Sequence, residues 1–202
     1  IDTKNYEFIN QKDKTEAART AVKLVSEKKA DLLMKGMLGT ARILKAVLDK
    51  EIGLRTQRLL SHAYVLKLAN YDKLLTMTDG AMNIAPRLEQ KAQILQNVIE
   101  FCHSLEIKEP KIAILAAVEL VNPNMQATID AACLSKMVER GQITGGIVDG
   151  PLAFDNAISK KAALHKGIQT KVSGEVDAVL VPEIESGNIF AKSLVYLANA
   201  EP

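Results

Sequence analysis

The chain has 202 residues, of which 48% are hydrophobic, and its mixed acidic and basic side chains give a formal net charge of +2 at pH 7. This length suits one large domain or two small ones with a sizeable core. The lack of a concentrated basic region argues against a nucleic-acid-binding protein, and no apolar run reaches the roughly 18 residues needed to span a membrane. We therefore expect a cytoplasmic protein that binds neither nucleic acid nor membrane.

The two cysteines, Cys102 and Cys133, each lie within an apolar helical pattern. Such positions are typical of buried thiols in a reduced compartment. The sequence has no CxxC pair and no cluster of histidine and cysteine, so it predicts no metal site.

Strand and helix patterns alternate along the chain. In its first part, amphipathic spacing predicts helices over 13–29 and 39–51, and apolar runs predict strands over 30–36, 56–68 and 73–79. A long helix over 87–105 begins just after Pro86, which suits the start of a helix. The remaining pattern predicts strands over 111–117, 143–150 and 177–182, and helices over 122–141, 155–166 and 188–199.

Continuous apolar strands separated by amphipathic helices indicate an α/β fold of three layers, with a mostly parallel sheet covered by helices on both faces. The least structured join lies at 78–86. It predicts a first α/β domain over 1–80 and a second α/β domain over 81–202; the family resemblance described below implies that the first is incomplete.

In open parallel sheets, ligands bind beyond the carboxyl ends of the strands. Polar residues and glycines gather at four of the predicted strand ends, within 34–36, 77–83, 148–151 and 181–188. These positions are therefore the candidate binding residues.

Two stretches of the first part carry cations that suit an anion. The run KGMLGT places Lys35, Gly36 and Thr40 between a predicted strand and a helix, where backbone N–H groups can hold an anion; a simple tight turn is the alternative. It lacks the GKS/T ending of a phosphate-binding P-loop. The run RTQRLLSH gathers cations and hydrogen-bonding groups that suit a phosphate, although a solvated edge strand explains them equally well; its residues are Arg55, Arg58, Ser61 and His62.

The run VDGPLAFDN contains two carboxylates at a predicted strand end. Asp155 either positions a substrate or caps the following helix. Asp149 has no such local structural role, which favours a functional one. The residues alone do not identify a reaction.

Four blocks together resemble the phosphate acetyl/butyryltransferase family, in the order in which that family carries them. They are LLMKGMLGTARILKAVLDKEIGLRTQRLLSH, TMTDGAMNIAP, VDGPLAFDNAIS and VPEIESGNIFAK. SHAYV and DGPLAFDNAIS look more like the butyryl branch than the acetyl branch.

The resemblance implies a fold like that of isocitrate and isopropylmalate dehydrogenases, with two domains, a cleft between them and a homodimeric assembly. It implies conversion of a short-chain acyl-CoA, with butyryl-CoA favoured, plus phosphate into acyl phosphate plus CoA. In the reverse direction the CoA thiol attacks the acyl phosphate directly in a ternary complex. CoA is then a substrate, and no cofactor is expected.

The matched blocks place candidate residues on two walls of that cleft. Arg58, Ser61 and His62 are the candidates for the phosphoryl end, and Asp149 faces them as a fourth catalytic candidate. The expected substrate-binding residues are Lys35, Gly36, Thr40, Arg55, Asp79, Asn83, Pro86, Gly150, Pro151, Asp155, Asn188 and Lys192.

The resemblance also implies missing parts. Family members are longer, and we expect segments before the first residue, and a C-terminal catalytic Ser-Arg motif with its aspartate, to lie outside this sequence. The alternative is thus a non-catalytic homologue or fragment that binds CoA or phosphate. A related dehydrogenase is disfavoured, because no metal-binding aspartates and no nucleotide site are evident.

Overall fold

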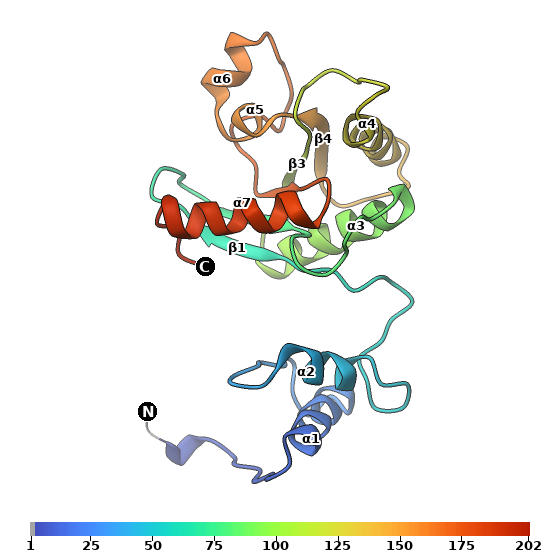
Figure 1. Cartoon of the computed structure of the whole chain (residues 1–202), viewed down its shortest axis with the longest axis vertical. Coiled ribbons are helices and arrows are strands. Elements are labelled where there is room, and N and C mark those ends of the chain that lie inside the picture. The colour runs from blue at the N-terminus through green and yellow to red at the C-terminus, as the bar shows by residue number, and fades with distance from the viewer. Residues whose placement is uncertain (1–2) are drawn as a thin grey trace. The chain divides into compact units, whose positions relative to one another are not determined.

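The computed structural model describes residues 3–202 and divides the chain into two compact units, residues 1–58 and 59–202 (Figure 1). The second unit begins where α3 (Leu88–Ser104) fixes the backbone of Leu59. The N–H of Leu59 donates to Gln93 Oε1 at 2.8 Å, and its carbonyl accepts from Asn97 Nδ2 at 2.8 Å. The domain division at residue 80, expected from the sequence, stays a prediction.

The first unit contains the short 3₁₀ helix η1 (Thr3–Asn5) and two α-helices, α1 (Lys14–Ser26) and α2 (Thr40–Val47). Asp13 begins α1 by accepting hydrogen bonds from the N–H groups of Thr15 and Glu16 at 2.8 and 2.9 Å, as an N-cap does. A small core joins the two helices and consists of Ala18, Val22, Ile43 and Ala46.

The strand predicted over 30–36 does not form in the described structure. A strand needs a neighbour to pair its N–H and C=O groups, and the described part of the first unit offers none. Leu32 and Met34 of this segment are consequently 73% and 85% exposed.

The second unit is built on a five-stranded sheet in the order β1-β2-β5-β3-β4. The strands are β1 (Tyr64–Lys67), β2 (Leu74–Thr78), β3 (Lys111–Leu115), β4 (Ile147–Leu152) and β5 (Ala178–Leu180). Only β1 pairs antiparallel with its neighbour, so the prediction of a mostly parallel sheet is confirmed. The first of these strands occupies only the end of the predicted run 56–68.

Helices cover both faces of the sheet. They are α3, α4 (Gln126–Glu139), α5 (Phe154–Ile158), α6 (Lys160–His165) and α7 (Ile184–Leu197). Alternate residues of β3 enter different cores: Ile112 and Ile114 pack with residues of α3 and α4, whereas Ala113 and Leu115 pack with residues of α5 and α7. The α/β fold of three layers is therefore confirmed for this unit.

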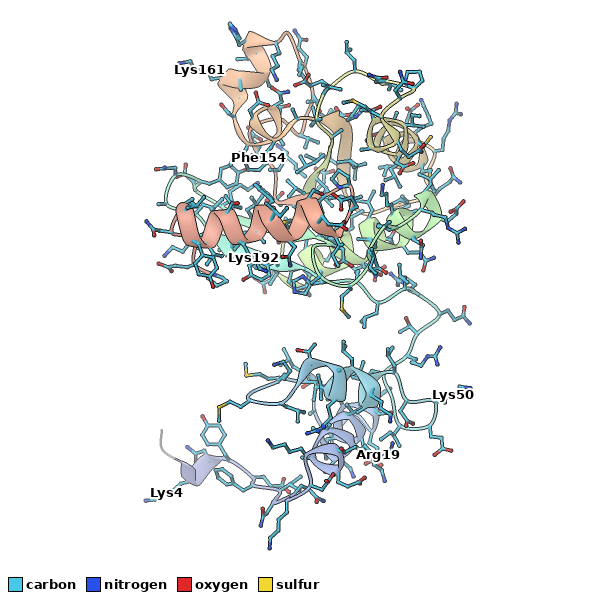
Figure 2. All side chains as sticks on the ribbon, viewed as in Figure 1. Lys4, Arg19, Lys50, Phe154, Lys161 and Lys192 are labelled. Carbon is cyan, nitrogen blue, oxygen red and sulfur yellow. The ribbon has the colours of Figure 1, made fainter. Side chains whose placement is uncertain are left out.

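The helix predicted over 155–166 is divided into α5 and α6. Ser159 separates them, and its hydroxyl accepts a hydrogen bond from the N–H of Ala162 at 3.3 Å, which caps α6. Phe154 of α5 packs edge-to-face on Phe190 of α7, with ring centroids 4.6 Å apart (Figure 2).

Cys102 is buried as predicted, and burial raises the pKa of its thiol to about 11. Cys133 is only partly buried, so the prediction of two buried thiols is wrong for this residue. None of the described helices is both long and apolar enough to cross a membrane.

Candidate functional site

The carboxyl ends of the parallel strands β2, β5, β3 and β4 lie on one edge of the sheet. This carboxyl edge is where open α/β sheets bind ligands. The candidate residues of the second unit precede β1, follow β2 and β5, or lie in and just after β4. Asp149 is in the middle of β4, which continues beyond the predicted strand end to Leu152.

Asp79 directly follows β2 and is only 2% exposed. Its Oδ1 accepts from the N–H groups of Ala81 and Met82 at 3.0 and 2.9 Å, and its Oδ2 accepts from Asn83 Nδ2 at 2.6 Å. Asn83 Nδ2 also donates to the carbonyl of Leu60 at 3.0 Å. Asp79 therefore shapes this loop and joins it to the segment that contains Ser61, while both of its oxygens are already engaged.

Ser61 and His62 lie beside this loop. Ser61 Oγ accepts from Asn97 Nδ2 at 3.0 Å, and the His62 ring lies 5.6 Å from that of Tyr64. His62 Nδ1 is buried without a hydrogen-bond partner among the described residues. Asn97 was not singled out from the sequence, where it is one polar residue of a long helix with no local signal of its contacts.

The loop after β2 touches the start of α7 through two glycines. A Cβ on Gly187 would lie 2.8 Å from the Cα of Gly80 and 2.7 Å from Val181 Cγ2. Asn188 Nδ2 donates to the carbonyl of Gly80 at 3.3 Å. Both predicted residues Asp79 and Asn188 thus belong to one packed corner, and Pro86 is buried in the same loop.

The sequence predicted a helix that begins only at residue 188, but α7 begins at Ile184, so Ser186, Gly187 and Asn188 all lie within the helix. Glu183 is the N-cap, and it accepts from the N–H groups of Glu185 and Ser186 at 2.8 and 2.9 Å. Burial alone would raise the pKa of Glu183, but the hydrogen bonds from Glu185 and Ser186 outweigh it and lower the pKa to about 2. Glu183 is consequently an anion fixed by the helix start.

Lys192 lies further along α7 and is exposed (Figure 2). It makes no ion pair with a described residue. Its amino group is therefore available to an anionic ligand.

Asp149 lies in β4 and is half-buried. Its Oδ1 accepts from the N–H of Gly150 at 2.8 Å, whereas no described residue bonds its Oδ2. Gly150 packs so tightly that a Cβ would lie 2.7 Å from the carbonyl oxygen of Ile114, and the bond from Gly150 to the buried Pro151 is cis. The glycine and the proline thus belong to a tightly packed backbone beside a carboxylate with one free oxygen.

Asp155 is not the N-cap that the sequence offered as one interpretation. Ala153 occupies that position of α5, and Asp155 lies in the first turn with its Oδ2 3.2 Å from Lys166 Nζ. Lys166 also pairs with Glu119 at 2.6 Å, and Asn156 donates a hydrogen bond to the same Glu119 oxygen. The hydrogen bond from Lys166 holds the pKa of Glu119 below its usual value. Glu119 and Lys166 were missed from the sequence because 47 positions separate them.

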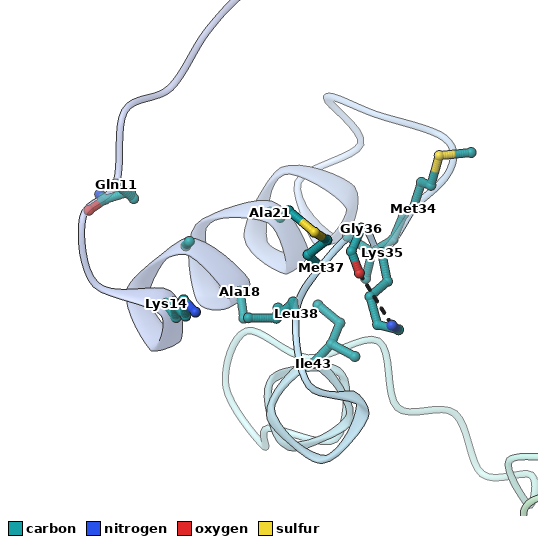
Figure 3. Close-up of a pocket in the computed structure, with 12 residues that line it drawn as sticks. Gln11, Lys14, Ala18, Ala21, Met34, Lys35, Gly36, Met37, Leu38 and Ile43 are labelled. Atoms are coloured by element: carbon teal, nitrogen blue, oxygen red, sulfur yellow. Dashed lines mark hydrogen bonds between the residues drawn. The ribbon is translucent and has the colours of Figure 1, made fainter.

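The other candidates belong to the first unit. Lys35 and Gly36 line a pocket of about 190 Å³ between α1 and the segment before α2, and Lys35 Nζ donates to the Gly36 carbonyl at 3.3 Å (Figure 3). Thr40 is the first residue of α2, and Arg55 is exposed. Arg58 is exposed as well, and the binding roles of these residues stay predictions.

No group of three or more histidine, cysteine, aspartate or glutamate side chains able to hold a metal ion occurs in residues 3–202 as the structure describes them.

The structure is that of an α/β protein with a mostly parallel sheet and candidate binding residues in the loops at its carboxyl edge. The chain belongs to the phosphate acetyl/butaryl transferase family, whose sequence profile matches residues 4–202. The resemblance stated from the four sequence blocks is thereby confirmed.

Relatives of the chain include proteins named phosphate butyryltransferase and proteins named phosphate acetyltransferase. The chain is 46% identical over 201 residues to a phosphate butyryltransferase of Clostridium acetobutylicum, a match that covers 100% of this chain and 67% of the relative. It is 49% identical over 201 residues to a phosphate acetyltransferase of Rickettsia prowazekii, covering 99% of this chain and 57% of the relative. The identities are too similar to choose between butyryl and acetyl transfer.

A solved structure supports the fold. The crystal structure of a branched-chain phosphotransacylase from Enterococcus faecalis V583 superposes with a TM-score of 0.87 at 34% identity, covering 96% of this chain and 70% of that one. The chain thus spans between 57% and 70% of the length of these three relatives.

Proposed function

We propose that the protein carrying this chain transfers a short acyl group between CoA and phosphate, with butyryl-CoA as the favoured substrate. The observation that carries the proposal is the family match over residues 4–202, joined to the Asp149 carboxylate in β4, whose Oδ2 has no hydrogen-bond partner among the described residues. Acyl-CoA and inorganic phosphate are then the substrates. We also propose a cytoplasmic homodimer that needs no cofactor.

The reaction is balanced without a covalent enzyme intermediate. A phosphate oxygen attacks the thioester carbonyl carbon, the C–S bond breaks, and the thiolate leaves and takes a proton. In reverse, the thiol sulfur attacks the carbonyl carbon of the acyl phosphate, the C–O bond to phosphate breaks, and a base takes the thiol proton.

We assign each candidate residue a role in this reaction that suits the chemistry of its side chain. In our proposal Oδ2 of Asp149, which has no partner among described residues, takes the thiol proton. Ser61 and His62 offer a hydroxyl and an imidazole nitrogen, and Arg58 offers a cation, for the phosphoryl end. Lys192 is a further cation toward the anionic substrate.

A CoA-release assay tests this function. The purified polypeptide that carries this chain is incubated with butyryl-CoA or acetyl-CoA, with and without phosphate, and free thiol is measured. We expect release that depends on phosphate and is faster from butyryl-CoA. An absence of phosphate-dependent release, with CoA still bound in calorimetry, would contradict the proposal and indicate a binding module.

A further inference from the structure

The loop that follows β3, residues 116–125, exposes apolar side chains at the carboxyl edge. Leu120 is 80% exposed and its neighbour Val121 is 55% exposed. Residues 120–129 contain no charged side chain. Two adjacent large apolar residues thus face solvent in an uncharged stretch, at the edge where a ligand is expected.

The first end of this loop is fixed against the segment that contains Asp149. The N–H of Ala116 donates to the carbonyl of Leu152 at 2.9 Å. Three residues further on, Glu119 accepts from Lys166 Nζ at 2.6 Å and from the fully buried Asn156. The loop therefore leaves the sheet in contact with residues that follow Pro151 in β4, α5 and the end of α6.

The second end is fixed by the start of α4. The N–H of Asn122 donates to Thr128 Oγ1 at 2.9 Å, and Thr128 is fully buried. The N–H of Asn124 donates in turn to Asn122 Oδ1 at 2.9 Å. Leu120 and Val121 are the two residues between these fixed points, so the fold itself presents them outward.

We propose that Leu120 and Val121 contact the acyl chain of the substrate and set the preference for its length, an inference that rests on the proposed function. The acyl chain is the neutral apolar end of acyl-CoA, and it suits an uncharged apolar loop better than the anionic nucleotide end does. A butyryl chain has two methylenes more than an acetyl chain, and each buried methylene strengthens binding roughly fourfold. Contact with this pair therefore favours the longer chain.

The test compares kcat/KM for butyryl-CoA and acetyl-CoA in the polypeptide that carries this chain and in its Leu120→Ala and Val121→Ala variants. We expect the ratio of butyryl to acetyl kcat/KM to fall roughly threefold to tenfold in each variant. The control is Leu197→Ala, which removes a similarly exposed side chain, 82% exposed, from the end of α7 and leaves the ratio unchanged.

A ratio that is unchanged in both loop variants would overturn the inference. So would a changed oligomeric state at an unchanged ratio, which would assign the pair to a contact between two copies of the chain. If the protein turns over neither substrate, the proposed function fails. The inference is then tested by calorimetry: the ratio of the affinity for butyryl-CoA to that for acetyl-CoA should fall in the loop variants, and an unchanged ratio would overturn it.

Lys166 is a positioning residue in this account, because it holds Glu119 and thereby the loop. Lys166→Met is expected to lower the same ratio, and Lys166→Arg to restore it, since arginine keeps the charge and the hydrogen bond. An equal loss of kcat/KM for both substrates in Lys166→Met would contradict this positioning role.

Discussion

Asp79, directly after β2, and Asp149, within β4, look alike in the sequence, but their oxygens differ in the structure. Both oxygens of Asp79 accept hydrogen bonds from the loop that follows β2, so this carboxylate stabilises the conformation of that loop. Asp149 keeps an oxygen without a described partner. At the scale of single residues, a free acceptor distinguishes a candidate for proton transfer from a structural carboxylate.

Glu183 gives a pH-dependent prediction at the same scale. Its pKa in the folded protein, about 2, lies below its ordinary value of 4.5, so its charge stabilises the fold above pH 4.5, and this stabilisation is lost as pH falls toward 2. We expect Glu183→Gln to lower the free energy of unfolding by about 1 kcal/mol at pH 7, with the difference shrinking between pH 4.5 and 2. Urea unfolding of both proteins at several pH values measures this, and a difference independent of pH would contradict it.

Between elements, the loop after β2 and the start of α7 pack closely because each has a glycine, with no side chain, at the point of contact. Gly80 and Gly187 allow this approach, and the N–H of Ile184 donates to the carbonyl of Ile84 at 3.0 Å across the same corner. The position of Asn188 relative to Asp79 follows from this contact.

Gly187→Ala tests the corner. The added methyl group would meet Val181 and the Gly80 backbone below 3.0 Å, so we expect a loss of about 1–3 kcal/mol in the free energy of unfolding. Gly36→Ala is the control, because a methyl group there has no neighbour within 4 Å and Gly36 caps no helix. Chemical denaturation compares the two variants, and equal stabilities would show that the corner adapts without cost.

At the scale of the whole molecule, the sequence predicted what depends on local periodicity. The helix over 87–105 and the apolar strand over 111–117 have patterns that specify their own structure, and both formed as α3 and β3. The run 30–36 has an equally apolar pattern but forms no strand, because pairing requires a neighbouring strand that a local pattern does not reveal.

The site was predictable only in part for the same reason. Polar residues at strand ends could be named because parallel topology brings them to one edge. The contacts of Asn97 with Ser61 and of Lys166 with Glu119 join segments 36 and 47 positions apart, so only the folded chain shows them.

Acyl transfer that depends on Asp149 is best tested by the turnover of the Asp149→Asn variant. Asparagine keeps the shape and the bond to the N–H of Gly150 but takes no proton, so we predict a loss of about 100-fold or more in kcat, with CoA affinity and unfolding unchanged. The control, Asp72→Asn, alters an exposed aspartate between β1 and β2 and should retain full turnover. Unchanged turnover and unchanged ligand affinity in Asp149→Asn would contradict the account.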